Sequence, residues 1–407
     1  MGKNNMTKIE NKIFDWIRKN IILIFLGAVT ILGVAIHLCG IDFQSDDYNS
    51  FLYPWWTRIE SAGVQGIATQ IGNYNIPYQI ITYLFTLTPL GPLYSYKALS
   101  IAFDFVLAGS AALLVYSFDS KKSYFKPAFT YGLIFCSMTV VLNSSFWAQC
   151  DSIYVSFILL SIYFLKNDKN IASFVMLGIA FAFKLQAVFI LPVYLFYYIC
   201  TRKVSILHFL IIPAVDFVMC LPAIILGRNP LDIITIYADQ TDYGKLIHMN
   251  CPNIYAFLCN GNDMTYYYLL KTLSIVLTFA ILGAGLCMLI YKRTDLFDRN
   301  NFLLASIWTV FTCIMFLSSM HERYAYLLDI LMIIYAVVNV KRVWLPIVCN
   351  LVSLRGYCFY LFSYDVLDIK ITAIVYIAVY AYVSYIFLKD VVINGKKIND
   401  KPKIKTA

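Results

Sequence analysis

Residues 20–39 read NIILIFLGAVTILGVAIHLC, a stretch of twenty residues without an acidic, lysine or arginine side chain. A stretch of this length and apolarity predicts a helix that crosses a lipid bilayer, which takes about 20 such residues. The whole 407-residue chain has the same character, because 60% of it is hydrophobic and only 14% is charged. Soluble proteins carry about 25% charged residues, and disordered chains are still more polar. The composition therefore excludes both classes and predicts an all-α polytopic membrane protein.

Apolar runs recur along the chain and predict about twelve spans, with about eleven to thirteen allowed by the uncertainty of the boundaries. The predicted spans are 20–39, 96–117, 127–144, 150–165, 171–183, 187–200, 204–226, 265–291, 301–318, 324–340, 343–362 and 369–388. Residues 77–92 are also apolar, but Pro77 opens them and Gly91-Pro92 closes them. Counting them as a span would place the basic residues of 121–126 outside. We therefore interpret them as a re-entrant or interfacial helix.

The basic residues set the orientation of these spans. Most of the 32 Lys and Arg lie near the N-terminus, in alternate short loops and near the C-terminus. Loops rich in Lys and Arg face the cytoplasm. We therefore expect a multi-pass protein of the plasma membrane with both termini in the cytoplasm. The net charge of +9 indicates this topology and no nucleic-acid partner.

The chain divides into an amphipathic cytoplasmic arm, a single membrane domain and a basic cytoplasmic tail, at residues 1–19, 20–390 and 391–407. In the arm, Ile9, Ile13 and Trp16 share one helical face, which predicts a helix lying on an anionic leaflet. Two long loops, 40–95 and 227–264, fall on the outer side of the membrane.

Unusual polar residues collect in the outer turns. The turns that carry them read SDDYNSFLYPWW (45–56), GNYNIPY (72–78), FWAQCDSIY (146–154), FKLQ (183–186) and MHERYAY (320–326). Ionic groups in or near a bilayer are costly, so their collection on one face indicates a functional site at the lipid–water boundary.

One chemistry fits this set of side chains. A carboxylate of the first outer loop can act as general base on an acceptor hydroxyl. Lys184 and Arg323 can hold an anionic phosphate leaving group. Aromatic side chains of the same turns can stack on sugars or line a lipid entrance. These roles together predict glycosyl transfer from a lipid phosphate at the outer face.

The same turns, in the same order, resemble the GT-C superfamily of polyprenyl-phosphate-sugar-dependent glycosyltransferases. The run SDDYNSFLYPWWTRIESAG, then NYNIPY, YKALSIAFDF, FWAQCDSIY, FKLQ and MHERY carries the resemblance over about residues 40–326. The most similar branch is bacterial and is related to the mannosyltransferase that adds the second mannose of GPI anchors. The dolichyl-phosphate-glucose glucosyltransferases are similar in layout.

The resemblance implies a GT-C-like fold, a catalytic acid in outer loop 40–95 and inversion at the anomeric carbon. The acid falls on Asp47 or its neighbour Asp46, and we favour Asp47. Loop 227–264 is predicted to bind substrate. The sequence indicates no cofactor, and it has no cluster of Cys or His with the spacing of metal ligands. Use of a divalent metal ion is left as an open alternative. On the donor side we predict Gln149, Asp151, Lys184, Gln186, His321, Glu322 and Arg323. On the acceptor or lipid side we predict Tyr48, Trp55, Tyr74, Tyr78, Trp147 and Asn253.

Ordinary structural roles compete with several of these assignments. Asp46 and Asp47 have the alternative of being solvated loop acids. Asp151 could instead cap the helix that begins there. Lys184 could instead be an ordinary lysine at the membrane edge that extends its ammonium group to the interface. Asp104 lies within a span and is expected to pair internally or to be neutral, because a charge there costs about 2.5–3.5 kcal/mol.

The leading hypothesis is a hexosyltransferase that uses a polyprenyl-phosphate-linked mannose or glucose and an extracytoplasmic glycan, glycolipid or cell-wall acceptor. A flippase or other transporter of lipid-linked sugars is the first alternative. Transporters place polar sites at the membrane midplane and have internal repeats, and this sequence has neither feature. The second alternative is a glycan polymerase or ligase whose donor is a lipid-diphosphate oligosaccharide.

Overall fold

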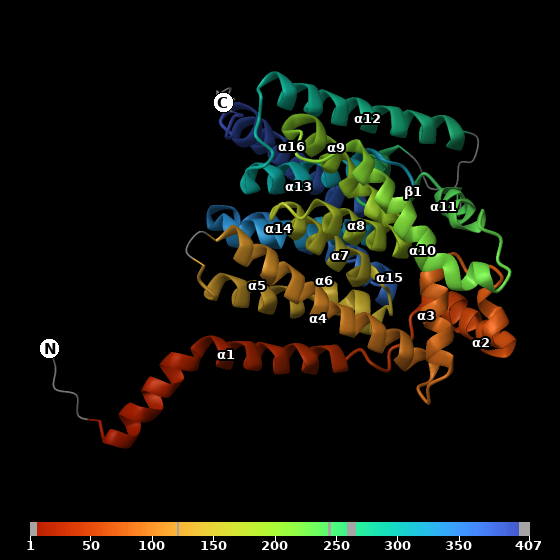
Figure 1. Ribbon diagram of the computed structural model, residues 1–407, viewed down its shortest axis with the longest axis horizontal. Coiled ribbons are helices and arrows are strands. Elements are labelled where there is room, and N and C mark those ends of the chain that lie inside the picture. Colours follow the sequence, from red (N-terminus) through yellow and green to blue (C-terminus); the bar gives the residue numbers. More distant parts are fainter. Residues whose placement is uncertain (1–5, 120–121, 243–245, 259–265, 399–407) are drawn as a thin grey trace, which may run out of the picture.

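The computed structural model describes residues 6–119, 122–242, 246–258 and 266–398. Within these ranges the fold is helical apart from two short strands, as predicted (Figure 1). The helices are α1 (Lys8–Leu38), α2 (Tyr53–Ala62), α3 (Ile76–Thr86), α4 (Pro92–Phe118), α5 (Phe125–Phe135), α6 (Met138–Val141), α7 (Asp151–Leu165), α8 (Asn170–Phe183), α9 (Leu191–Thr201), α10 (Ile211–Ile225), α11 (Asp232–Asp242), α12 (Tyr267–Tyr291), α13 (Arg299–Phe316), α14 (Tyr326–Val338), α15 (Trp344–Phe362) and α16 (Ile369–Ile386). The strands are β1 (His248–Met249) and β2 (Met320–His321).

Six helical segments of the described chain are long and apolar enough to cross a membrane. They are α1, α4, Ile206–Ile225, α12, α15 and Ile369–Ile393. A seventh results if α5 and Met138–Phe146, which meet at 45°, form one bent span. Each of the twelve predicted ranges coincides with a helix or a pair of helical segments, but α7, α8 and Leu185–Thr201 are short.

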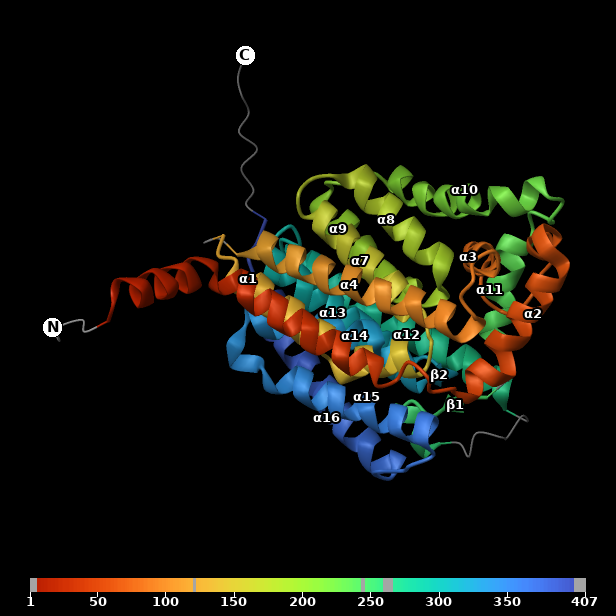
Figure 2. The same cartoon turned by 90° about the horizontal axis from the view of Figure 1, so that it is seen from below.

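The apolar residues 77–92 do form a separate short helix. α3 begins at Ile76, where the side chain of Asn75 caps it, and α4 begins at Pro92. α3 lies beside α2 at one end of the helical bundle (Figures 1 and 2). With 11 residues, α3 is too short to cross a bilayer as a helix.

The described ends of the chain lie at the opposite end of the bundle from α2, α3 and α11 (Figures 1 and 2). Between these two ends, α13 and α14 form the centre, and nearly all their side chains are buried. Helices that are apolar on every side are typical of such a central position. α12 covers one outer side of the bundle and α1 another (Figure 1).

The arm and the first predicted span form one continuous helix. α1 begins after Thr7, whose side chain forms a capping box with Glu10, and it has no end near residue 20. No proline interrupts the sequence over this length. The first turns lean away from the bundle (Figure 1). Residues 1–5 of the arm and 399–407 of the tail lie outside the described residues.

The acid in the middle of α4 is paired, as expected. Asp104 Oδ2 lies 3.2 Å from Nε2 of His37 in α1, and both side chains are buried. His37 Nδ1 lies 2.7 Å from the Gly33 carbonyl oxygen. The pair joins α1 to α4 within the apolar part of the bundle.

A lysine of α4 fixes the start of the first outer loop. Lys97 is fully buried, and its Nζ donates to the carbonyl oxygens of Gly40, Ile41 and Phe43, at 2.6 Å and 2.9 Å for the first two. Carbonyls at and beyond a helix C-terminus have no partner in the helix itself. Lys97 therefore holds the segment that leads from α1 to Asp47.

Replacing Lys97 by Met keeps most of the side-chain volume but leaves the carbonyls of Ile41 and Phe43 without a donor, while the Gly40 carbonyl keeps the backbone N–H of Phe43. We expect Lys97→Met to lower the free energy of unfolding by about 2 kcal/mol or more, because a buried polar group without a partner costs about 1–3 kcal/mol. Thermal unfolding in detergent measures the change. Lys126→Met, at an exposed lysine, is the control, and equal shifts for the two variants would contradict the capping role.

Candidate active site

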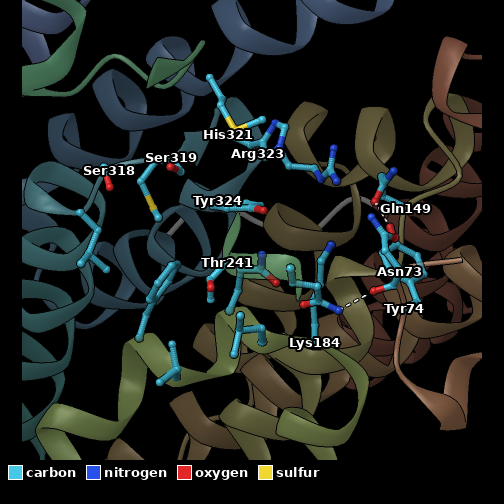
Figure 3. A pocket seen from close by; sticks show the side chains of 18 of the residues that line it. Asn73, Tyr74, Gln149, Lys184, Thr241, Ser318, Ser319, His321, Arg323 and Tyr324 are labelled. Carbon is cyan, nitrogen blue, oxygen red and sulfur yellow. Dashed lines mark hydrogen bonds between the residues drawn. The ribbon is translucent and has the colours of Figure 1, made fainter. Parts of the chain in front are cut away.

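A cavity of about 540 Å³ lies at the bundle end that carries α2, α3 and α11. This volume is within the range of about 300–1,000 Å³ typical of ligand pockets. Its wall comes from the first outer loop and α2, the turn after α8, the first half of α12, the turn between α13 and α14, and the end of α15. Tyr74, Gln149, Lys184 and Arg323 gather on one side of it (Figure 3).

Asp47 is held by side chains from three distant segments. Its Oδ2 accepts hydrogen bonds from Trp147 Nε1 at 2.7 Å, from Gln149 Nε2 at 2.9 Å and from the Arg323 guanidinium at 3.4 Å. Its Oδ1 accepts one from the hydroxyl of Tyr360. The carboxylate is only 14% exposed. These bonds fix its position in the cavity wall.

The turn before α7 supplies two of these donors. Trp147 is fully buried, its ring stacks on that of Tyr360 with centroids 4.2 Å apart, and the Arg323 guanidinium lies 5.0 Å from the indole centroid. Gln149 in turn accepts a 2.6 Å hydrogen bond from the Tyr74 hydroxyl at its Oε1. Aromatic packing and hydrogen bonds thus join four segments around one carboxylate.

A buried ion pair lies next to this group. The ammonium of Lys184, at the end of α8, pairs with Oδ1 of Asp151, at the start of α7, and both side chains are almost completely buried. Asn143 Nδ2 donates to the other oxygen, Asp151 Oδ2, at 2.8 Å. Lys184 also lies 5.8 Å from the centroid of the Tyr74 ring. Lys184 therefore presents the positive end of this ion pair to the cavity, while Asp151 lies behind the wall.

The turn between α13 and α14 brings His321 and Arg323 to the cavity. β2 in this turn pairs in parallel with β1, so that His248 lies opposite Met320, and Ser319 before it has a positive φ of 58°. Ser319 also donates from its hydroxyl to the carbonyl oxygen of Leu246 at 2.7 Å. Loop 227–264 is therefore fastened to the turn that carries Arg323.

The pKa values of His321 and Glu322, which are neighbours in this turn, are shifted in opposite directions. Burial, assisted by the neighbouring Arg323, lowers the pKa of His321 to about 3, so its imidazole is uncharged at neutral pH. Burial raises the pKa of Glu322 to about 7, although Arg323 opposes this shift. Glu322 is not part of the cavity wall and packs against α15, where an added Cβ at Gly356 would lie 2.6 Å from its Cβ.

Aromatic rings form another part of the cavity wall. Trp55 and Tyr74 meet edge to face at 5.5 Å, and Tyr74 meets Tyr78 in the same way at 4.8 Å. Gly72 allows this packing, because a Cβ there would lie 2.5 Å from the Trp55 ring and its φ of +81° is one that glycine adopts without strain. Further round the wall, Val188, Phe189 and Ile275 give an apolar surface.

The structure sorts the predicted site residues into three groups. Those that line the cavity are Asp47, Trp55, Tyr74, Gln149, Lys184, Gln186, His321 and Arg323. Those that lie behind the wall and bond to a lining residue are Trp147 and Asp151. Those that are not part of the wall are Asp46, Tyr48, Tyr78, Asn253 and Glu322.

The members of the last group have other surroundings. Asp46 is exposed, and Tyr48 is buried among α2 and its neighbours. Asn253 is buried and donates to the carbonyl oxygens of Ile314 and Leu317, at 3.2 and 3.3 Å. Asn253 thus satisfies the C-terminal end of α13 and fastens loop 227–264 there. Residues 243–245 and 259–264 of that loop lie outside the described residues.

Three further polar lining residues were not predicted from the sequence: Ser318, Ser319 and Tyr360. The lining residues Asn73, Gln240 and Thr241 lie in loops 40–95 and 227–264, which were predicted to contribute to the site. Tyr360 ends a predicted span on the outer side, which is the one signal that pointed to it. Tyrosines are common at both membrane interfaces for other reasons, so this signal is weak.

Among the described residues no group of three His, Cys, Asp or Glu side chains could hold a metal ion. No family model matches the chain, and no curated protein matches it significantly. The chemistry that the site can perform is therefore inferred from the geometry of the cavity.

The buried Lys184–Asp151 pair leads to a stability prediction. Lys184→Met leaves the Asp151 carboxylate buried without its cation, and breaking a buried pair in this way costs about 3–5 kcal/mol. The double variant Lys184→Met/Asp151→Asn removes both charges and should regain most of that loss. Thermal unfolding in detergent compares the two. A single variant no less stable than the double variant would contradict this pairing.

A second prediction concerns pH. The pKa of Glu322 is about 7 in the folded protein and near 4.5 for the free side chain. The folded state therefore holds the extra proton, and its stability falls as the pH rises from about 4.5 to about 7. Glu322→Gln cannot lose a proton and should fall less over this range. Unfolding midpoints in detergent at several pH values test this, and an unchanged slope would contradict the burial of an ionisable Glu322.

Proposed function

We propose that the chain is a membrane glycosyltransferase that moves a hexose, mannose or glucose, from a polyprenyl-phosphate-linked donor to an extracytoplasmic glycan, glycolipid or cell-wall acceptor. In this proposal the GT-C-like chain crosses the plasma membrane about twelve times. Both termini face the cytoplasm, and the cavity opens at the outer face. The position of the described chain ends, opposite the cavity, supports this orientation.

One observation carries the proposal: a carboxylate fixed in a cavity wall beside cations, at the end of an apolar bundle. Asp47 is the general base in this scheme. Arg323 uses one nitrogen to reach Asp47 at 3.4 Å, and a guanidinium has five N–H donors. It can therefore keep this bond and still bind a phosphate oxygen. Lys184 adds positive potential to the same side of the cavity.

The remaining wall suits the other parts of the substrates. The edges and faces of Trp55 and Tyr74 can pack against sugar rings. The apolar surface of Val188, Phe189 and Ile275 can accept the first isoprene units of the donor lipid. Asn73, on the polar side, can bond to sugar hydroxyls. Polar and apolar walls in one cavity match a substrate with a sugar at one end and a hydrocarbon chain at the other.

The reaction follows from these positions. The acceptor hydroxyl gives its proton to Asp47 while its oxygen attacks the anomeric carbon. The bond from that carbon to the phosphate oxygen breaks, and the phosphate leaves with the electron pair. Its charge grows from one negative charge toward two, and Arg323 and Lys184 stabilise that increase. Attack opposite the leaving phosphate inverts the anomeric carbon.

Release of polyprenyl phosphate from a polyprenyl-phosphate-hexose donor by purified protein tests the proposal. Asp47→Asn should lower the turnover at least 100-fold, because a general base contributes about 10²–10⁴-fold. Asp46→Asn is the matched comparison at the neighbouring exposed acid and should stay within about twofold of the unaltered protein.

Full turnover of Asp47→Asn would contradict the role of the base. Movement of labelled lipid-linked sugar across sealed vesicles without bond cleavage would replace the proposal by a transporter. Turnover of only lipid-diphosphate oligosaccharides would replace it by a polymerase or ligase.

A further inference from the structure

Tyr360 is the one contact of Asp47 that comes from α15. It lies in the last turn of that helix, lines the cavity and donates its hydroxyl hydrogen to Asp47 Oδ1. Its ring stacks on Trp147 at an interplanar angle of 15°, and the indole N–H of Trp147 binds the other carboxylate oxygen. The two stacked rings therefore hold both oxygens of the same carboxylate from one side.

The hydrogen bonds are distributed unequally over the carboxylate. Oδ2 accepts from Trp147, Gln149 and Arg323, whereas Oδ1 accepts from Tyr360 alone. An ionised carboxylate has about four lone-pair sites on its two oxygens. Oδ2 is saturated by its three donors, so the remaining capacity to accept a proton is on Oδ1, next to the Tyr360 hydroxyl.

We infer that Tyr360 is a positioning residue that presents Oδ1 of Asp47 as the proton-accepting oxygen. This inference rests on the proposed function. The acceptor hydroxyl forms its hydrogen bond to the free site of Oδ1, and its proton moves there as the new bond to the anomeric carbon forms. Tyr360 neither gains nor loses a proton in this step. It holds the carboxylate so that Oδ1 faces the cavity and not the indole.

Other ionisable groups around Asp47 have to be separated from this effect. Arg323, His321 and Glu322 approach it from the turn before α14, and Tyr74 approaches it from the first outer loop. Lys184 lies farther round the same wall. The hydroxyl of Tyr360 donates its hydrogen to Asp47 and to none of these groups. Removing that hydroxyl alone therefore isolates its bond to Oδ1.

Tyr360→Phe keeps the ring that stacks on Trp147 and removes only the hydroxyl. We expect kcat for lipid-phosphate release to fall about tenfold to a hundredfold, as expected for a base held in the wrong orientation. KM for the donor should stay within about twofold. Tyr364→Phe is the control at an exposed tyrosine just beyond the helix, and it should not change either constant. Unchanged kcat in Tyr360→Phe would overturn the inference.

A second readout needs no turnover. A hydrophobic carbodiimide reacts with carboxyl groups, and peptide mass spectrometry gives the labelled fraction of Asp47. Without the Tyr360 hydroxyl, Oδ1 has no donor among its described contacts and is open to the reagent. The labelled fraction of Asp47 at a fixed pH should therefore rise at least about twofold in Tyr360→Phe and not in Tyr364→Phe.

The two readouts separate two kinds of failure. An unchanged labelled fraction of Asp47 in Tyr360→Phe overturns the inference whether or not the protein is a glycosyltransferase. A raised fraction in a protein that turns over no polyprenyl-phosphate sugar would instead contradict the proposed function, and the contact between Tyr360 and Asp47 would stand.

Discussion

A largely buried carboxylate at the end of an apolar helical bundle needs hydrogen-bond donors or cations beside it. Asp47 is such a carboxylate, and segments far apart in the chain supply its donors. Its partners Trp147, Gln149, Arg323 and Tyr360 lie 100, 102, 276 and 313 residues further along the chain. A buried charge without such partners would cost several kcal/mol. The bundle that brings these segments together therefore also assembles the candidate site.

Polar contacts outside the cavity make this arrangement rigid. Asn75 Nδ2 lies within 3.1 Å of Asp216 in α10 and 2.7 Å of the Tyr237 hydroxyl in α11. Arg228 bonds to Gln79 of α3 at 2.9 Å and to Asp232 of α11 at 3.1 Å. Loops 40–95 and 227–264 are thereby tied to each other. Such a frame can hold catalytic groups in place before substrate arrives, which is where much of enzymatic rate enhancement originates.

The sequence was sufficient for the helices and for much of the cavity wall. Long apolar runs determine where helices lie, and the structure places helical segments on all twelve predicted ranges. The outer polar turns could be grouped because ionic side chains are costly in lipid. The turns before α7 and α14 do meet the first outer loop, although they are far from it in sequence.

Which of the candidate residues line the cavity depends on the directions of their side chains. The hydropathy pattern of the sequence gives no information on those directions. Asp46 and Asp47 are adjacent, and neighbouring residues at a helix start point apart, so only the structure separates the exposed acid from the lining one. Asn253 looked like a substrate ligand and instead caps α13. Tyr360 looked like any interfacial tyrosine. The role proposed for it depends on a stacking contact with Trp147 across the fold.

The proposed function requires that this cavity binds a lipid phosphate beside Asp47. A cryo-electron microscopy map of the protein with a polyprenyl phosphate bound would locate that ligand. We expect phosphate density within hydrogen-bonding distance of Arg323, with the prenyl chain leaving along Val188 and Ile275. Phosphate density at the opposite end of the bundle, or midway along it, would overturn the proposal.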